Sequence, residues 1–337
     1  MNSLTPAQAQ ARLAAMQGRR IAVVGDFMVD RYLWGHVTRI SPEAPVPIVE
    51  IESETHQLGG AANVANNLAS LGAVPCPVGV FGEDSSGERL LDLMRESGFE
   101  AGGMLADRSR PTTTKTRIIA HHQHVVRTDR ESRANIDAGM QEKLFAYLRD
   151  LMPGLHGIII EDYNKGVIAQ PLLSRLIELA NQHHCLITVD PKFNHFFDYR
   201  RVTLFKPNRK EAEEVLAAKL RTDEELQKAG ELLLRRLECK NVLITLGAEG
   251  MALFRPDMGM HRIPTRARRV HDVSGAGDTV IATLTLAMAA GAEVLEAATL
   301  ANYAAGVVIG EVGAVPIDKQ KLMNTIAEHM QWEDSSR

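Results

Sequence analysis

Short apolar runs alternate with amphipathic helical patterns along most of the chain. Residues 21–25, 157–162 and 186–190 are runs of this kind, and each ends in glycine or an acidic residue. Runs of this length are typical of strands that are buried on both faces, as in parallel sheets. With helices between them, at a spacing of roughly thirty residues, they predict an α/β fold: a doubly wound, mostly parallel sheet with helices on both faces. Further strands are predicted at 201–206 and 242–250, and helices at 3–18, 59–71, 84–97, 139–152, 169–182, 222–237, 279–290, 293–310 and 316–330.

Two stretches depart from this pattern. In residues 46–52, apolar and polar side chains alternate, which is typical of a strand with one face in solvent. Prolines at positions 42, 45 and 47 exclude a central place in a sheet, because proline cannot donate a ladder hydrogen bond. Residues 113–120 and 125–129 have a similar character. We therefore expect β-excursions from the main sheet in both regions, and another at 251–268.

The composition is that of a globular protein with a full core, because 45% of the 337 residues are hydrophobic and 24% are charged. The formal net charge of -4 gives no general attraction to nucleic acid or to membrane surfaces. Cys76, Cys185 and Cys239 are widely separated and typical of inert thiols in a reducing compartment. No apolar run is as long as a membrane span, and the N-terminus lacks a secretory pattern. We expect a cytoplasmic protein.

The strongest chemical signal is the stretch Asp272-Val-Ser-Gly-Ala-Gly-Asp278, which leads directly into a helix of small and apolar residues. A glycine turn before a helix leaves backbone N–H groups pointing outward at the positive end of the helix dipole, and such groups bind anions. A carboxylate beside a bound phosphate would repel it. Asp278 therefore fits better as a base that takes a proton from a hydroxyl attacking that phosphate. The alternative is an ordinary helix start with an acidic first turn.

Other chemistries lack their motifs in this chain. A P-loop requires Gly-Lys followed by Ser or Thr, and the sequence contains no Gly-Lys pair. The strand at 21–25 is followed by Asp-Phe-Met-Val-Asp, not by the glycine-rich turn of a dinucleotide-binding fold. The Gly-x-Ser-x-Gly elbow of many serine hydrolases is absent. His121, His122 and His124 suggest zinc, but neighbours in a strand face opposite ways and no Cys or acidic partner has suitable spacing.

The stretch 272–278 resembles the signature of the ribokinase-like (PfkB) carbohydrate kinases. The resemblance implies that Asp278 is the catalytic base and that the amides of Gly275, Ala276 and Gly277 form the anion hole. It also implies ATP and Mg2+ as cofactors and a sugar as the acceptor. In that family the magnesium ion is bound to ATP and is not held directly by the protein.

The same resemblance implies a nucleotide-binding set. Asn208 and Glu211 match a family motif that organises magnesium and the ATP phosphates through water. From the residues alone this pair is a helix capping box, and both interpretations are compatible. Thr245, Gly247 and Gly250 follow a strand and would lie along the nucleotide. Three further glycines, whose role as part of an adenine pocket or of a monovalent-cation site is left open, are Gly306, Gly310 and Gly313.

A sugar-binding set follows from a second family signature, which Gly59, Gly60 and Asn63 match. Asp30 lies where the family uses an aspartate for substrate hydroxyls. Asp26 ends the first strand and has either this role or a part in the turn. A phosphorylated sugar also requires cations. Polar residues on segments expected to surround the sugar are Arg117, Arg127, Asp162, Lys165 and Lys192, and a role at the surface is an equal alternative for each cation except Lys192.

The family resemblance also implies a small β-lid, often shared across a dimer. We place the lid at about 31–58 and 110–130, within a single kinase domain that spans 1–337, and expect a homodimer through the lid. Within the family, the stretches at 25–35, 39–47, 57–65 and 162–166 resemble the branch that phosphorylates the anomeric hydroxyl of D-glycero-β-D-manno-heptose 7-phosphate. Members of that branch act in ADP-heptose and lipopolysaccharide core synthesis.

Some members of this branch carry a nucleotidyltransferase domain, and we expect none in this chain. The shared motifs do not separate the heptose phosphate from fructose phosphates, ribose or a nucleoside, and they leave the anomer open. A non-catalytic sugar-binding protein of the same fold is the remaining alternative. Such a protein would be expected to lose Asp278 or the pair Asn208 and Glu211, and this chain retains all three.

Overall fold

A nine-stranded sheet forms the centre of the molecule in the computed structural model, which describes residues 4–121, 123–266, 270–311 and 313–335. The strand order is β13-β12-β11-β10-β9-β8-β1-β4-β5. Neighbouring strands from β11 to β5 pair in parallel, and β12 and β13 pair antiparallel at one edge. The strands are β1 (Arg20–Gly25), β4 (Val74–Gly82), β5 (Gly103–Asp107), β8 (Gly157–Glu161), β9 (Leu186–Asp190), β10 (Leu204–Phe205), β11 (Asn241–Thr245), β12 (Met251–Arg255) and β13 (Gly259–Ile263).

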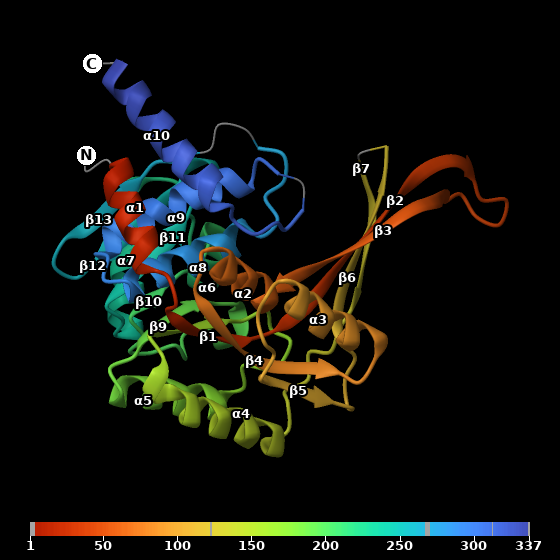
Figure 1. The fold of residues 1–337 in the computed structure, drawn as a ribbon, viewed down its shortest axis with the longest axis horizontal. Helices are drawn as coiled ribbons and strands as arrows, with labels where there is room; N and C mark the ends of the chain where they lie inside the picture. Colours follow the sequence, from red (N-terminus) through yellow and green to blue (C-terminus); the bar gives the residue numbers. More distant parts are fainter. Residues whose placement is uncertain (1–3, 122, 267–269, 312, 336–337) are drawn as a thin grey trace.

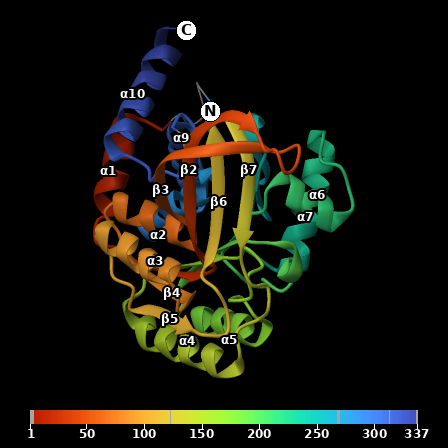
Figure 2. The same cartoon turned by 90° about the vertical axis from the view of Figure 1, so that its right-hand side faces the viewer.

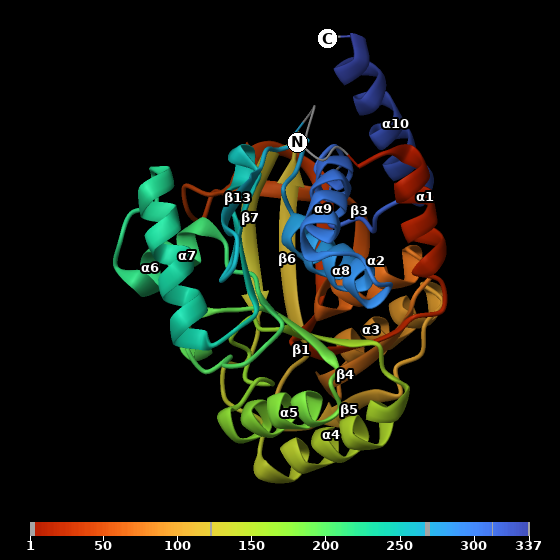
Figure 3. The ribbon, with the colours of Figure 1, turned by 90° about the vertical axis from the view of Figure 1, so that its left-hand side faces the viewer.

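Successive residues of each strand face opposite sides of the sheet, so each strand contributes to two cores. In β1, Ile21 and Val23 belong to one hydrophobic cluster, whereas Ala22 and Val24 belong to the other. The first cluster includes residues of α1, α2, α3, α8, α9 and α10, and the second includes residues of α4, α5, α6 and α7. Figures 1 and 3 show helices on both sides of the sheet, as the sequence predicts for a doubly wound fold.

Several helices begin at a residue whose side chain accepts a backbone N–H of the first turn, which stabilises the helix start. Thr5, Asp84, Asp137, Asn208 and Thr222 have this role. The helices are α1 (Pro6–Ala15), α2 (Ala61–Ser70), α3 (Ser85–Glu96), α4 (Ala138–Leu151), α5 (Gln170–Gln182), α6 (Arg209–Leu216), α7 (Asp223–Leu237), α8 (Ala276–Ala289), α9 (Val294–Val308) and α10 (Lys319–Ser335), with short 3-10 turns at Met152–Gly154, Phe193–His195 and Gly247–Glu249.

A second sheet of four strands, in the order β3-β2-β6-β7, projects from the body of the molecule. Its strands are β2 (Phe27–Ile40), β3 (Pro47–Gly60), β6 (Thr113–Ala120) and β7 (Gln123–Arg130), and Figure 2 looks onto this sheet. We call it the lid. The lid strands cover two of the three regions where the sequence predicts β-excursions, although β2 and β3 extend a few residues further toward the main sheet. The third prediction, at 251–268, is wrong, because β12 and β13 form the antiparallel edge of the main sheet. Every residue of β7 is exposed.

The strands β4 and β5 are the main elements that the sequence analysis missed. Pro75 and Pro77 lie in β4, where proline normally argues against a strand. Both precede the part of β4 that pairs with β5, which begins at Val78, so neither removes a hydrogen bond between those two strands. The strand predicted at 201–206 is only the two residues of β10. Among the described helices, none is long and apolar enough to cross a membrane.

Candidate active site

The glycine turn and helix α8 place Asp278 at the centre of the site. Gly275 precedes the helix with a φ of 75°, and a Cβ there would lie 2.7 Å from Asn63 Nδ2, so this position requires glycine. Among the described residues, no side chain caps α8, and Gly275 and Gly277 line a cavity. The N–H of Ala276 donates to the carbonyl oxygen of Val273 at 3.3 Å, whereas the N–H of Gly277 is available to an anion in that cavity.

Both oxygens of the Asp278 carboxylate accept hydrogen bonds from other elements. The Asn63 side-chain amide donates to Oδ2 at 2.8 Å, and the Tyr163 hydroxyl donates to Oδ1 at 2.9 Å. Burial raises the pKa of Asp278 above its usual range and the charge of Asp190 acts in the same direction, whereas the two hydrogen bonds lower it. The carboxylate is thus held in one orientation and is a stronger base than an exposed aspartate.

Two further carboxylates lie beside Asp278. Oxygens of Glu161, Asp190 and Asp278 are all within 4.8 Å of one another, a geometry that could hold a metal ion. Lys206, itself buried, places its Nζ 2.6 Å from Asp190 Oδ2. Burial, together with the charges of Asp190 and Asp278, raises the pKa of Glu161 well above its usual range. The positive charge that balances this acidic group therefore comes from Lys206.

Two adjoining cavities lie beside the N-terminus of α8. The larger has a volume of about 560 Å³ and a charged lining that includes Asp190, Lys192 and Lys206. The smaller, of about 360 Å³, is lined mainly by glycine and apolar residues such as Val280 and Ile309. A charged cavity beside an apolar one suits a ligand with a polyphosphate at one end and an aromatic ring at the other. The residues that line both cavities are Thr245, Gly247, Val273 and Gly277.

Asn208 and Glu211 form a capping box at the start of α6, as the residue pattern predicts. Asn208 Oδ1 accepts the N–H of Glu211 at 2.9 Å, and Glu211 Oε2 accepts the N–H of Asn208 at 2.8 Å. The other carboxylate oxygen of Glu211 pairs with Lys192 Nζ. Lys192, which we expected at the sugar phosphate, thus lies in the larger cavity beside a residue of the nucleotide-binding set.

The turn after Thr245 contains two glycines with positive φ, 62° at Gly247 and 87° at Gly250. A Cβ at Gly250 would lie 2.1 Å from the carbonyl oxygen of Ile263, whereas one at Gly247 would meet no atom within 4 Å. Gly250 is needed for the close approach to β13. Gly247 needs glycine only for its backbone conformation, and it forms part of the wall that the two cavities share. Gly306 lines the smaller cavity.

The lid contributes a largely buried charged pair. Arg117 Nη1 on β6 lies 2.8 Å from Asp30 Oδ1 on β2. A Cβ at Gly59 would lie 2.8 Å from Asp30 Oδ2, and Gly60 has a φ of 56° where β3 passes into α2. Gly59 therefore lets β3 approach Asp30 closely, whereas a Cβ at Gly60 would lie 2.7 Å from the carbonyl oxygen of Asp26. Contact of any of these residues with a sugar stays a prediction.

The loop after β8 is fixed by two buried aspartates. Asp162 accepts hydrogen bonds from the Tyr199 hydroxyl and from the N–H of Asn164, both at 2.7 Å. Its two oxygens therefore already have protein donors. The carboxylate of Asp26 accepts backbone N–H groups of three loop residues at 2.8–3.3 Å, which supports a part in the turn; these residues are Tyr163, Lys165 and Val167.

Two of the predicted cations have partners outside the cavities. Lys165 Nζ pairs with Glu131 at 2.6 Å. Arg127 on β7 pairs with Asp129 at 3.0 Å, and its side chain is 56% exposed. Their contact with a substrate phosphate stays a prediction, as it does for Arg117. The histidine cluster is only partly visible, because His122 lies outside the described residues.

Sequence reasoning did not single out several residues that the fold brings to the site. Glu161, Asp190 and Lys206 end or follow parallel strands, and the carboxyl ends of such strands carry ligand sites, so this signal was present. Tyr163 also follows a parallel strand, β8, and lies in the stretch 162–166, whereas Lys115 on β6 carried no such signal. Lys115 Nζ lies 4.7 Å from the centroid of the Tyr163 ring.

Comparisons with known proteins agree with this geometry. Residues 19–320 match the family described as "pfkB family carbohydrate kinase". The chain is 44% identical over 304 residues to the bifunctional protein HldE of Geobacter metallireducens, which covers 90% of this chain and 62% of that protein. The chain thus spans less than two thirds of the length of this relative.

Two solved structures share the fold. Phosphofructokinase-2 of Escherichia coli in complex with fructose-6-phosphate has a TM-score of 0.75 and 18% identity, over 93% of this chain and 99% of that one. Arabidopsis thaliana ribokinase complexed with ribose and ATP has a TM-score of 0.72 and 18% identity, over 92% and 99%. The architecture is therefore the ribokinase-like α/β fold with a separate lid sheet. With the glycine turn, Asp278 and the two cavities, the match over residues 19–320 shows that the chain belongs to the pfkB family of carbohydrate kinases.

Proposed function

We propose that this chain is an ATP-dependent sugar kinase that phosphorylates the anomeric hydroxyl of D-glycero-β-D-manno-heptose 7-phosphate to the 1,7-bisphosphate, a step toward ADP-heptose and the lipopolysaccharide core. The observation that carries the kinase assignment is Asp278, oriented by two hydrogen bonds beside the open N-terminus of α8. The family and the resemblance of four stretches to heptose kinases support the substrate.

In the proposed reaction, Asp278 takes the proton of the sugar hydroxyl as that oxygen attacks the γ-phosphorus of ATP. The N–H groups of Gly275, Ala276 and Gly277 stabilise the negative charge on the transferring phosphoryl group. Asn63 and Tyr163 donate to the ionised form of Asp278, and so they keep it able to accept a proton.

The nucleotide would lie across both cavities, with adenine in the apolar one and the phosphates in the charged one. Lys192 and Lys206 line the charged cavity and would bind phosphate oxygens. Magnesium supplies positive charge to the phosphates when it is bound. Asn208 and Glu211 fit a cation held through water, because their side-chain oxygens already accept hydrogen bonds or pair with Lys192.

The sugar would lie between the lid and Asp278, with Asp30, Gly59, Gly60 and Asn63 at its hydroxyl groups. Arg117 is the cation best placed for the phosphate end, because it is largely buried and belongs to the lid. We propose that residues 1–337 form one kinase domain whose lid pairs with that of a second copy. Exposed apolar side chains on the lid support such a dimer: Ile40, Val46, Ile51, Val125 and Val126.

The cytoplasm is the proposed location, because ATP is available there and the three cysteines are unpaired thiols. ADP release should be measured with Mg-ATP and a panel of acceptors: the heptose 7-phosphate, fructose 6-phosphate, ribose and adenosine. Turnover on the heptose phosphate alone is expected. Turnover on another sugar would keep the kinase assignment and overturn the substrate, and turnover on none would favour a sugar-binding protein.

A further inference from the structure

Tyr163 is a half-buried residue of the site with contacts on three sides. It follows β8, and its hydroxyl donates to Asp278 Oδ1 at 2.9 Å. Two ammonium groups approach its ring: Lys115 Nζ at 4.7 Å from the centroid and Lys192 Nζ at 5.6 Å. Lys115 belongs to the lid and Lys192 to the wall of the larger cavity. Tyr163 therefore contacts the lid through Lys115, the larger cavity through Lys192, and the proposed base Asp278 through its hydroxyl.

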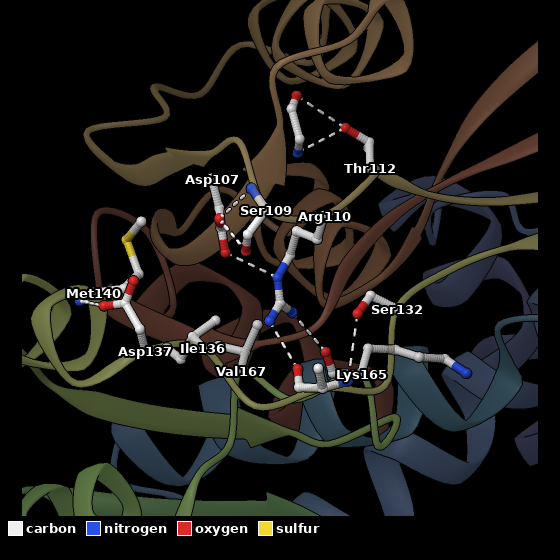
Figure 4. Close-up of polar contacts among 12 residues, drawn as sticks. Asp107, Ser109, Arg110, Thr112, Ser132, Ile136, Asp137, Met140, Lys165 and Val167 are labelled. Carbon is white, nitrogen blue, oxygen red and sulfur yellow. Dashed lines mark hydrogen bonds and ion pairs between the residues drawn. The ribbon is translucent and has the colours of Figure 1, made fainter.

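Arg110 holds the loop that carries Tyr163, and Figure 4 shows the contact between Arg110 and Lys165 of this loop. The buried guanidinium of Arg110 donates to the carbonyl oxygens of Lys165 at 2.8 Å and Ala134 at 2.7 Å, and to Asp107 Oδ2 at 2.9 Å. The carboxylate of Asp26 also accepts three backbone N–H groups of the loop. These hydrogen bonds hold the backbone of the loop in place. The phenol of Tyr163 therefore reaches Asp278 from a fixed backbone position.

Lys115 on β6 is the residue through which the lid contacts the Tyr163 ring. Lys115 pairs in register with Asp30 of β2 and with Asp129 of β7, and Arg117 follows two residues later on the same face of the strand. A cation beside an aromatic ring is attracted by the electron-rich face, more strongly where water is excluded. A shift of the lid that moves Lys115 therefore changes the contacts of the Tyr163 ring.

We propose that Tyr163 is a positioning residue that orients the carboxylate of Asp278 through its hydroxyl and is itself held by Lys115 of the lid. The inference rests on the proposed function, in which a sugar binds between the lid and α8. In this proposal, the orientation of the Asp278 carboxylate depends on the position of the lid. Phosphoryl transfer is therefore favoured when the lid is in contact with the loop that carries Tyr163.

A pH readout separates this role from a purely structural one. The charged and titratable groups that face Asp278 are Glu161, Asp190, Lys206 and the Tyr163 hydroxyl. Of these, the hydroxyl and Lys206 favour the ionised carboxylate. Loss of the hydroxyl therefore raises the pKa of Asp278 and moves the acidic limb of the kcat/KM profile to higher pH.

The variant Tyr163→Phe removes the hydroxyl and keeps the ring. We expect kcat to fall about tenfold, the effect of losing one hydrogen bond to an ionised group, while KM for ATP changes less than about twofold. Tyr199→Phe is the matched control, because it also removes a buried phenol–carboxylate bond, at 2.7 Å, but to Asp162. The control should lower the melting temperature and leave the acidic limb where it is.

A double-mutant cycle with Lys115→Met tests the connection to the lid. If Tyr163 transmits the contact, Lys115→Met lowers kcat in the wild-type background and adds little further loss in the Tyr163→Phe background. Losses that multiply would show that the two residues act independently, and would overturn the part of the proposal that involves the lid.

A measurement without substrate keeps this inference separate from the proposed function. The carboxyl group of Asp278 can be titrated by 13C NMR in the free protein, and Tyr163→Phe should raise its pKa relative to wild type while Tyr199→Phe should not. An unchanged pKa and an unchanged acidic limb in an active enzyme would overturn the inference. A wild-type protein with no turnover would overturn the proposed function, and the NMR titration would still decide the role of Tyr163.

Discussion

The nucleotide side of the site and its lid side are built on different kinds of structure. On the nucleotide side, α8 is buried at every position from Asp278 to Ala287, and its partner strands lie inside the main sheet. On the lid side, β7 is exposed at every residue, and the inner part of β3 is buried only near Gly59 and Gly60. Rigid packing thus supports the base and the anion site, whereas the lid has little core of its own.

This contrast separates the residues proposed for phosphoryl transfer, which lie on the core, from those proposed for sugar selection, which lie on the lid. The parts that act on a phosphate need fixed positions, and the core provides them. The parts that select a sugar lie on strands with few buried contacts, which can change sequence or position at a lower cost in stability. Variants on the two sides should therefore fail in different ways, and four predictions use this difference, from the largest expected effect to the smallest.

The largest effect is expected at the base. Asp278→Asn keeps the shape of the side chain and removes its ability to take a proton, so kcat should fall by roughly 10² to 10⁴-fold. ATP binding, measured by calorimetry, should stay close to that of wild type, because the nucleotide cavities are unchanged. Near-normal turnover of this variant would show that another group is the base.

The glycines of the turn after β11 test how rigid the nucleotide side is. Gly250→Ala places a Cβ 2.1 Å from a backbone oxygen, whereas Gly247→Ala meets no atom within 4 Å, although both positions have positive φ. We expect Gly250→Ala to lower the free energy of unfolding by about 3 kcal/mol and Gly247→Ala by about 1 kcal/mol. Chemical denaturation measures both, and equal losses would mean that backbone conformation alone explains the requirement for glycine.

The loop beneath the lid should make stability depend on pH through Asp26. Burial, with the neighbouring Asp162, raises the pKa of Asp26 to about 6. Because this value is above that of an unfolded aspartate, at about 4, the contribution of Asp26 to stability is complete below pH ~4 and is lost as the pH rises through about 6. The expected loss is about 3 kcal/mol.

The variant Asp26→Asn should therefore show a flatter dependence of the unfolding free energy on pH between about 4 and 6.5. Its stability at a single pH is a poor guide, since Asn also weakens the hydrogen bonds to the loop. Denaturation curves collected across the pH range give the slope directly. A slope equal to that of wild type would assign the titration to other buried carboxyl groups, such as Glu161.

The smallest effects are expected on the lid and should concern the sugar alone. Arg117→Ala leaves Asp30 without its partner in a largely buried position, so KM for the sugar phosphate should rise roughly 10-fold or more. Arg127→Ala removes an exposed pair with Asp129 and should change KM less than about twofold. In both variants KM for ATP should be unchanged. A large effect of Arg127→Ala would return it to the substrate-binding set and would favour a lid that closes further over the sugar.

Local patterns were enough to predict much of this protein. The alternation of apolar runs and helices indicated the α/β sheet, the stretch from Asp272 to Asp278 indicated an anion site at a helix start, and the spacing of Asn208 and Glu211 indicated a capping box. Each of these depends on residues that are close in sequence, and turn, cap and burial patterns act over that range. Prolines and alternation marked β3 as an excursion from the main sheet, and the family resemblance identified this excursion as part of a lid. The strand β4, which contains Pro75 and Pro77, was missed.

Only the tertiary structure decided which side chains meet. Asn63 and Tyr163 are 215 and 115 positions away from Asp278 and contact it because β8, α2 and α8 converge at the carboxyl ends of the strands. The partners of Lys192, Lys165 and Arg127 were likewise set by neighbours from other elements. A charged residue pairs with whichever opposite charge the fold brings within a few ångströms. The partner therefore cannot be predicted from the spacing of residues in the sequence. The sequence by itself thus determined most secondary-structure elements and the class of chemistry. The packing of distant elements determined which side chains contact one another in the site.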